Sequence, residues 1–165
     1  MPSKRLFANA VAAVALIAAS CGGTSPSAAS TPSPSSASSP SEAGTGTTIA
    51  TANSSKIGQG ILVDGKGMTL YLFVADTGTA STCYQACAQI WPPVLTTGAP
   101  AAGPGAQQSL LGTTTRTDGK VEVTYGGHPL YYFVQDKQAG DTTGQAVNSF
   151  GALWWVVSPS GAAIH

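Results

Sequence analysis

Two cysteines that lie close together have the clearest potential for chemistry in this sequence. Cys83 and Cys87 are four residues apart, so in a helix they would share one face and lie within reach of a disulfide bond. Such a pair is either a structural staple or a redox-active dithiol. We favour the staple, because the segment carries no Lys, Arg or His that would lower the pKa of a thiol.

Two aspartates suggest a second kind of chemistry. Asp76 and Asp136 stand at the same position of a repeated motif. If the two copies pack about a twofold axis, the carboxyl groups could act as an acid/base pair. An aspartate at the end of a strand more often accepts N–H bonds from the following turn, and we expect this role. The two histidines, His128 and His165, form no local ligand pair with the cysteines or with each other, so we expect no metal or other cofactor.

The motif that contains these aspartates occurs twice, sixty residues apart and without a gap. Residues 67–76 read GMTLYLFVAD and residues 127–136 read GHPLYYFVQD. Repetition of this kind indicates one supersecondary unit that is used more than once. The residues that make up the repeated motif are Tyr71, Phe73, Asp76, Tyr131, Phe133 and Asp136.

The first copy predicts a buried central strand within a hairpin. Residues 70–74 read LYLFV, so both faces of the strand are apolar, as in a strand that is covered on both sides. A Gly-containing turn at 64–67 joins this strand to the apolar residues 61–63, which is the pattern of a hairpin.

The second copy predicts a similar hairpin. A Gly-Gly turn follows residues 120–125, which read KVEVTY. Their alternation is typical of a half-buried strand, with Glu122 facing solvent and Val121 facing the core.

After each aspartate the two copies diverge. A serine or threonine at 81–82 is expected to cap a short helix over residues 82–90, which two prolines follow. With a gap of three residues, Trp91 of the first copy aligns with Trp154 of the second.

The N-terminus has the pattern of a secretion signal. Two basic residues precede a mostly apolar run, which is too short for a bilayer span of about 20 residues. The small residues that end at Cys21 resemble the lipobox of bacterial lipoproteins. This resemblance implies that residues 1–20 are a signal peptide and that Cys21 carries fatty acids such as palmitate. Residues 21–48 are almost all Ser, Pro, Ala, Thr and Gly, which predicts a disordered linker.

The doubled motif has the form Tyr-x-(Phe/Trp/Tyr)-x-x-Asp, and in the first copy Ser81, Cys83, Cys87 and Trp91-Pro92-Pro93 follow it. This combination resembles the bacterial secreted-repeat lipoproteins over nearly all of residues 57–160. The family has no established molecular function, so the resemblance implies an identity without a mechanism. The second copy lacks both cysteines, which argues against a chemistry that needs two equivalent dithiol sites. With Cys21 lipidated, an even pair of cysteines remains for a disulfide in an oxidising compartment.

The sequence therefore predicts a mainly β fold. Two hairpin-centred repeats, residues 57–97 and 117–160, are expected to pack into one compact globular domain over residues 49–165, with one short helix. The pattern leaves open whether the sheets form a sandwich or a closed barrel.

The charge of the chain bears on its partners. Without the signal peptide, five basic and seven acidic residues give a net charge of −2, with no basic cluster to bind nucleic acid. We expect a module that is lipid-anchored at the extracytoplasmic face of the cell membrane, is not an enzyme, and binds an envelope protein or a small-molecule ligand. The alternative is a redox or electron-transfer lipoprotein that uses Cys83 and Cys87 or a bound metal. Hydrolysis by the two aspartates is the third alternative.

Overall fold

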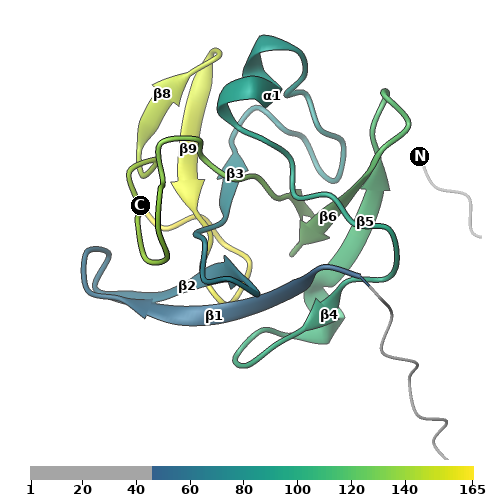
Figure 1. Cartoon of the computed structure of the whole chain (residues 1–165). Helices are drawn as coiled ribbons and strands as arrows, with labels where there is room; N and C mark the ends of the chain where they lie inside the picture. The colour runs from purple at the N-terminus through teal and green to yellow at the C-terminus, as the bar shows by residue number, and fades with distance from the viewer. Residues whose placement is uncertain (1–45) are drawn as a thin grey trace, which may run out of the picture. The chain divides into compact units, whose positions relative to one another are not determined.

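A computed structural model describes residues 46–165 of the chain (Figure 1). The predicted signal peptide, Cys21 and nearly all of the predicted linker lie outside the described residues. The elements in chain order are β1 (Thr48–Ser54), β2 (Gln59–Asp64), β3 (Tyr71–Phe73), α1 (Ala86–Ile90), β4 (Ala101–Ala102), the 3-10 turn η1 (Gln108–Leu110), β5 (Leu111–Thr115), β6 (Val121–Tyr125), β7 (His128–Pro129), β8 (Val147–Ser149) and β9 (Ala152–Val156). The prediction of a mainly β fold with one short α-helix is confirmed.

The strands form three small sheets, in the orders β2-β1-β4, β3-β9-β8 and β5-β6-β7. All strand pairs are antiparallel except β1 with β4, which are parallel. The predicted hairpins are present as short pairings, with Val63 bridging Thr69 in the first copy and β6 pairing with β7 in the second. Isolated bridges extend these three sheets to residues outside the named strands.

The segment that follows the motif in each repeat, which we call its tail, packs against the other repeat. β3 of the first repeat pairs with β9 of the second, which sets Phe73 opposite Trp154. Reciprocally, Pro93 in the tail of the first repeat bridges Tyr131 of the second. The predicted alignment of Trp91 with Trp154 is correct. The exchange itself was not predicted, because an alignment of two copies does not show which copy a tail packs against.

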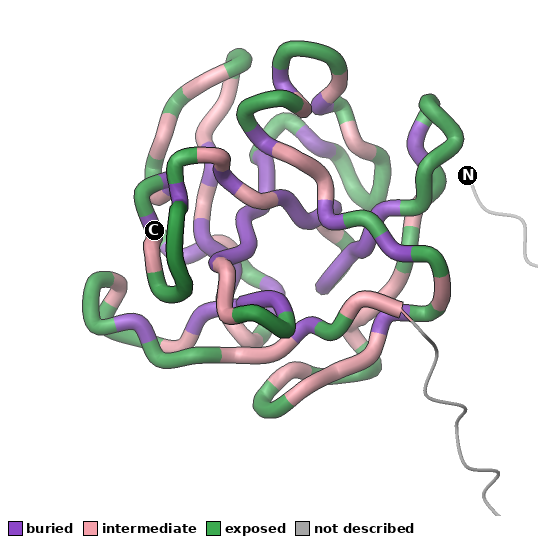
Figure 2. The backbone as a smooth tube through the Cα atoms, in the orientation of Figure 1, coloured by how far each residue is buried: buried purple, intermediate pink, exposed green. Residues whose placement is uncertain are grey.

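Two apolar clusters lie on either side of β3, and together they form the buried interior (Figure 2). Tyr71 and Phe73 belong to one cluster, and Leu70 and Leu72 belong to the other. The prediction that this strand is buried on both faces is therefore confirmed for residues 70–73. It is wrong for Val74, which is 51% exposed, because the chain turns directly after β3.

Two details of the second repeat differ from expectation. Residues 130–134 form no strand, and among them only Tyr131 forms bridges, one to Tyr71 and one to Pro93. Glu122 is fully buried and Val121 is 37% exposed, the reverse of the prediction. The reason is Arg116, also buried, which forms an ion pair with Glu122 inside the domain, whereas Val121 is the first residue of its strand.

The helix α1 begins later than predicted and without the predicted cap. Its N-cap residue is Gln85, which has a φ of 50° and makes no side-chain capping bond. Ser81 and Thr82 do not cap the helix, because both precede the N-cap residue; Ser81 Oγ instead accepts from the N–H of Cys83, and the Thr82 hydroxyl donates to Asp76.

Candidate functional site

The two motif tyrosines meet at the centre of the domain. The N–H of Tyr71 donates to the carbonyl of Tyr131 (2.9 Å), and the N–H of Tyr131 donates to the carbonyl of Tyr71 (3.0 Å). Both residues are fully buried. This reciprocal bridge relates the two copies by a local twofold axis.

Each tyrosine hydroxyl reaches the motif aspartate of the other copy. Tyr71 Oη donates to Asp136 Oδ2 (2.6 Å), and Tyr131 Oη donates to Asp76 Oδ2 (2.5 Å). Burial raises the pKa of both tyrosines far above the ordinary value. The carboxylate of Asp136 raises the pKa of Tyr71 further. The charges of Glu122 and, to a smaller extent, Asp76 raise the pKa of Tyr131 further. The phenols therefore remain protonated donors. We call these two Tyr–Asp pairs the clasp.

The second oxygen of each clasp carboxylate holds the turn that follows it. Asp76 Oδ1 accepts bonds from the backbone N–H and the hydroxyl of Thr82, both at 2.7 Å. Asp136 Oδ1 accepts the same two bonds from Thr143, at 2.9 and 2.5 Å. The expected turn-capping role is thus present, and each aspartate also binds the opposite repeat. In this geometry the partners of each carboxylate are a tyrosine and a threonine rather than the other aspartate.

Four aromatic rings stack across the same axis, in the order Phe73, Trp154, Trp91, Phe133. The two indole centroids are 4.0 Å apart with 2° between the ring planes, and each phenylalanine lies 4.1 Å from the tryptophan of the other copy. Both indole N–H groups donate to Ser149, one to its hydroxyl (3.1 Å) and one to its carbonyl (3.3 Å). The motif phenylalanines therefore join the repeats through apolar contact, as the motif tyrosines do through hydrogen bonds.

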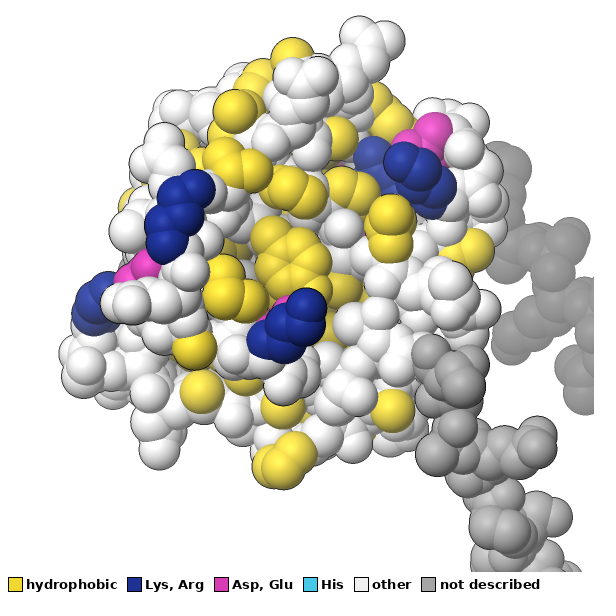
Figure 3. All heavy atoms as spheres, viewed as in Figure 1, with side chains coloured by type: hydrophobic (Ala, Val, Ile, Leu, Met, Phe, Trp, Pro, Cys, Tyr) yellow, Lys and Arg dark blue, Asp and Glu magenta, His cyan; other side chains and the backbone are white. Residues whose placement is uncertain are grey.

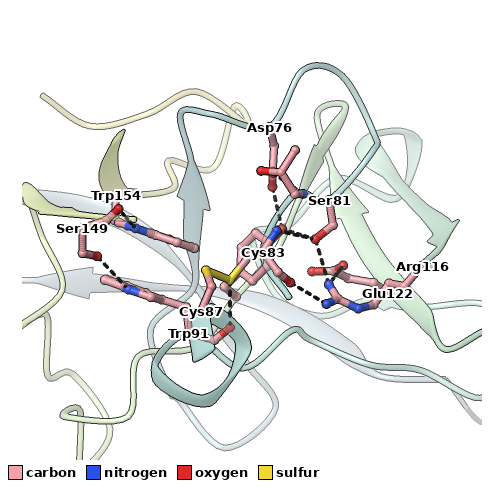
Figure 4. The surroundings of a disulfide bond; sticks show 11 residues. Asp76, Ser81, Cys83, Cys87, Trp91, Arg116, Glu122, Ser149 and Trp154 are labelled. Carbon is pink, nitrogen blue, oxygen red and sulfur yellow. Dashed lines mark hydrogen bonds and ion pairs between the residues drawn. A yellow bond between two sulfur atoms is a disulfide. The ribbon is translucent and has the colours of Figure 1, made fainter. Parts of the chain in front are cut away.

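Cys83 and Cys87 form a disulfide, and it lies beside the tryptophan stack (Figure 4). Their Cα atoms are 5.2 Å apart, and the two residues are 0% and 6% exposed. The N–H of Trp91 donates to the carbonyl of Cys87 (2.7 Å), so the bridged turn leads directly into the stack. The disulfide that the spacing predicted is therefore present.

A buried ion pair that sequence reasoning missed lies next to the disulfide (Figure 4). Arg116 Nη1 donates to Glu122 Oε2 (2.6 Å) and to Ser81 Oγ (2.8 Å), and Arg116 Nη2 donates to the carbonyl of Cys83 (2.6 Å). Burial raises the pKa of Glu122 to about 7, although Arg116 offsets part of this effect. Ser81 Oγ also forms a hydrogen bond with Tyr131 Oη (2.7 Å), so the ion pair, the disulfide loop and the clasp form one network.

One signal in the sequence could have revealed this ion pair. Glu122 in the second repeat occupies the position that Ile61, a core residue, has in the first. A charged residue at an apolar position of a repeat needs a buried partner. Arg116 Nε and Glu122 Oε1 have no hydrogen-bond partner within residues 46–165.

The two histidines lie at one hollow of the surface rather than apart. The residues that line this hollow of about 240 Å³ are Leu72, Phe73, Val74, Asp76, His128, Ala163 and His165. Among the described residues, no group of three or more His, Cys, Asp or Glu is placed to hold a metal ion. The helices of that same part of the chain include none that is long and apolar enough to cross a membrane.

The fold and the clasp define a duplicated β domain whose two copies are joined by their shared motif. The chain belongs to the family described as a secreted repeat of unknown function, whose model matches residues 54–95 and 112–158. The resemblance drawn from the sequence is therefore confirmed, and each matched range contains one Tyr–Phe–Asp motif. No curated protein and no solved structure matches the chain.

Proposed function

We propose that this protein is a lipoprotein anchored by Cys21 at the extracytoplasmic face of the cell membrane, and that its β domain is a non-catalytic module that binds a partner of the envelope. The lipobox-like end of the signal sequence supports the anchor. Membership of a secreted family supports the location outside the cytoplasm. The composition of the linker supports a tether that holds the domain away from the membrane.

The observation that carries the non-catalytic part of the proposal is the use of the motif inside the domain. All four clasp residues are buried, and the hydroxyl and carboxylate groups bond to each other across the twofold axis. The motif that defines the repeat is thereby accounted for as the junction of the two copies. We therefore place the binding function on the surface of the domain.

The surface is suited to contacts with a protein rather than with a polyanion. Figure 3 shows a face where apolar side chains gather and charged ones are scattered. On the surface, Leu95 and Val121 are exposed apolar residues beside a groove of about 640 Å³. Exposed apolar surface of this kind is typical of interaction sites.

The anchor is tested by a Cys21→Ser variant of the full chain. We expect the wild-type protein to incorporate labelled palmitate and to sediment with membranes, and the variant to do neither. Equal sedimentation of the two proteins, with no label in the wild type, would contradict the anchor.

The alternative, a redox lipoprotein, depends on the disulfide beside the tryptophan stack. Burial of Cys83 and Cys87 opposes it, because thiol exchange requires access to a sulfur atom. We expect the native protein to resist thiol labelling after treatment with a mild reductant. Full labelling without unfolding, and reoxidation to the starting state, would favour the redox function instead.

A further inference from the structure

The internal symmetry gives β1 and β2 equivalent strands, or twins, on the side of the second repeat. Leu62 of β2 and Val123 of β6 make the same backbone bonds: each donates at 2.8 Å to the tail of a repeat, and each accepts from the N–H of the leucine that precedes a motif tyrosine. These two residues therefore occupy equivalent positions of the two repeats, and we call such residues twins. Thr51 of β1 lies opposite Leu62 and Thr113 of β5 lies opposite Val123, so β1 and β5 are twins as well.

In the first repeat, an extended segment covers the outer edge of β1. Residues 101–105 read AAGPG and run parallel to the strand. The N–H of Gly103 donates to the carbonyl of Ile49 (2.7 Å), and the N–H of Thr51 donates to the carbonyl of Pro104 (2.9 Å). A Cβ atom added at either glycine would crowd the side chains of β1, so the cover consists of small residues for a steric reason.

In the second repeat, the twin edge has no cover among the described residues. β5 is the end strand of its sheet, with β6 on its one paired side (Figure 1). The N–H of Arg116 donates to the carbonyl of Lys120 (2.9 Å), and since antiparallel bonds alternate, Thr113 and Thr115 must present their N–H and C=O groups to the open side. Both threonines are exposed.

The edge of β5 also lacks the features that usually prevent pairing. Natural edge strands are protected by charged residues, prolines or bulges, or are very short. β5 has five residues, reads LGTTT, and contains neither a charge nor a proline. An unprotected edge of this length offers a complete template for another strand.

We propose that the β5 edge is a docking site for an extended, uncharged peptide of small residues, contributed by the envelope partner of this protein. The peptide adds a strand parallel to β5, as residues 101–105 do on β1. The N–H of Thr113 and the carbonyl of Leu111 are the twins of the two groups that β1 uses. The inference rests on the proposed binding function and supplies its surface and the chemistry of its partner.

The first test is a titration of the ¹⁵N-labelled full chain with a capped peptide that copies residues 99–106, APAAGPGA. We expect saturable amide shifts centred on Thr113 and Thr115. The matched control peptide carries an N-methyl group on its first glycine, which removes the donor for Leu111. It should bind about fivefold more weakly, since one backbone hydrogen bond corresponds to a factor of roughly 2 to 10.

The second test changes the protein. Thr113→Pro removes the outward N–H without removing a bond to β6, whereas Thr113→Val keeps this donor. We expect about fivefold weaker binding for the proline variant and wild-type binding for the valine variant. If the proline variant does not fold, the N-methyl peptide decides the question. Absence of binding, shifts centred elsewhere, equal binding by both variants, or self-association through β5 in place of peptide binding would each overturn the proposal.

Cross-linking in intact envelopes separates this proposal from the binding function itself. We expect the wild type and Thr113→Val to capture a partner that Thr113→Pro does not. Capture of the same partner by all three proteins would overturn the docking site and leave the binding function standing. Capture of none, even by the wild type, would count against the binding function.

Discussion

The turns that follow the clasp aspartates are held in different ways in the two repeats. In the first repeat, the disulfide between Cys83 and Cys87 closes this turn. In the second, Gly144 follows the capping threonine, and its N–H donates to Tyr71 Oη (3.2 Å). A Cβ atom at Gly144 would lie 2.8 Å from ring atoms of Tyr71 and Trp91, so the position requires glycine. The same junction thus tolerates a covalent staple on one side and close packing on the other.

The two repeats also differ in the interior beside the clasp. The first repeat places Ile61 in the apolar cluster, and the second places Glu122, paired with Arg116, at the twin position. A buried ion pair contributes little net stability compared with apolar packing, but it is costly when one partner is removed. The comparison indicates that the motif specifies the junction, while the residues around it are free to solve the packing in different ways.

The largest effect is expected from removing a tryptophan of the aromatic stack, and comparing the two tryptophans tests whether the two halves of the stack are equivalent. Trp91→Ala and Trp154→Ala should each lower the free energy of unfolding by about 3–5 kcal/mol, because each removes a fully buried ring. Urea denaturation followed by circular dichroism measures both. A difference of more than about 2 kcal/mol between them would break the symmetry of the stack.

A comparable loss of stability is expected when one partner of the buried ion pair is removed. At pH 8, Arg116→Met should cost about 3–5 kcal/mol, because it leaves a buried carboxylate without its partner. The double variant Arg116→Met/Glu122→Ile, which gives the second repeat the residue of the first, should recover most of this loss. A double variant as unstable as the single one would show that the twin positions are not interchangeable.

Removal of the disulfide should have a smaller effect. The Cys83→Ser/Cys87→Ser variant opens a loop of five residues, for which chain entropy predicts a loss of about 2 kcal/mol. The fold should persist, because the second repeat holds its twin turn without a bridge. Thermal melts of the variant, and of the wild type with reductant, measure the change; loss of the near-ultraviolet tryptophan signal at 25 °C would contradict it.

The last expected effect is a dependence of stability on pH. The pKa of Glu122 is about 7 in the folded protein and has an ordinary value of 4.5. The folded chain therefore holds this proton more tightly than the unfolded chain, so the free energy of unfolding should fall as pH rises from about 4.5 to about 7 and then level off. The Arg116→Met/Glu122→Ile variant should lose this slope, and an unchanged slope would assign the effect to another group.

The sequence predicted the parts of the fold that depend on local pattern. The repeated motif, the buried strand at residues 70–73 and the alignment of Trp91 with Trp154 follow from composition and spacing. The orientation of Glu122 was not predictable from alternation, because its burial depends on Arg116 across the hairpin. The exchange of tails and the clasp were not predictable either, since both are contacts between repeats that are distant in sequence.

The most direct test of the account is a set of double-mutant cycles on the clasp. Tyr71→Phe combined with Asp136→Asn, and Tyr131→Phe combined with Asp76→Asn, should each show a coupling free energy of about 1–3 kcal/mol, because each pair shares a buried hydrogen bond between repeats. Tyr71→Phe combined with Asp76→Asn, a pair within one repeat, should be additive within about 0.5 kcal/mol. Coupling within repeats, with additivity between them, would contradict the claim that the motif joins the two copies.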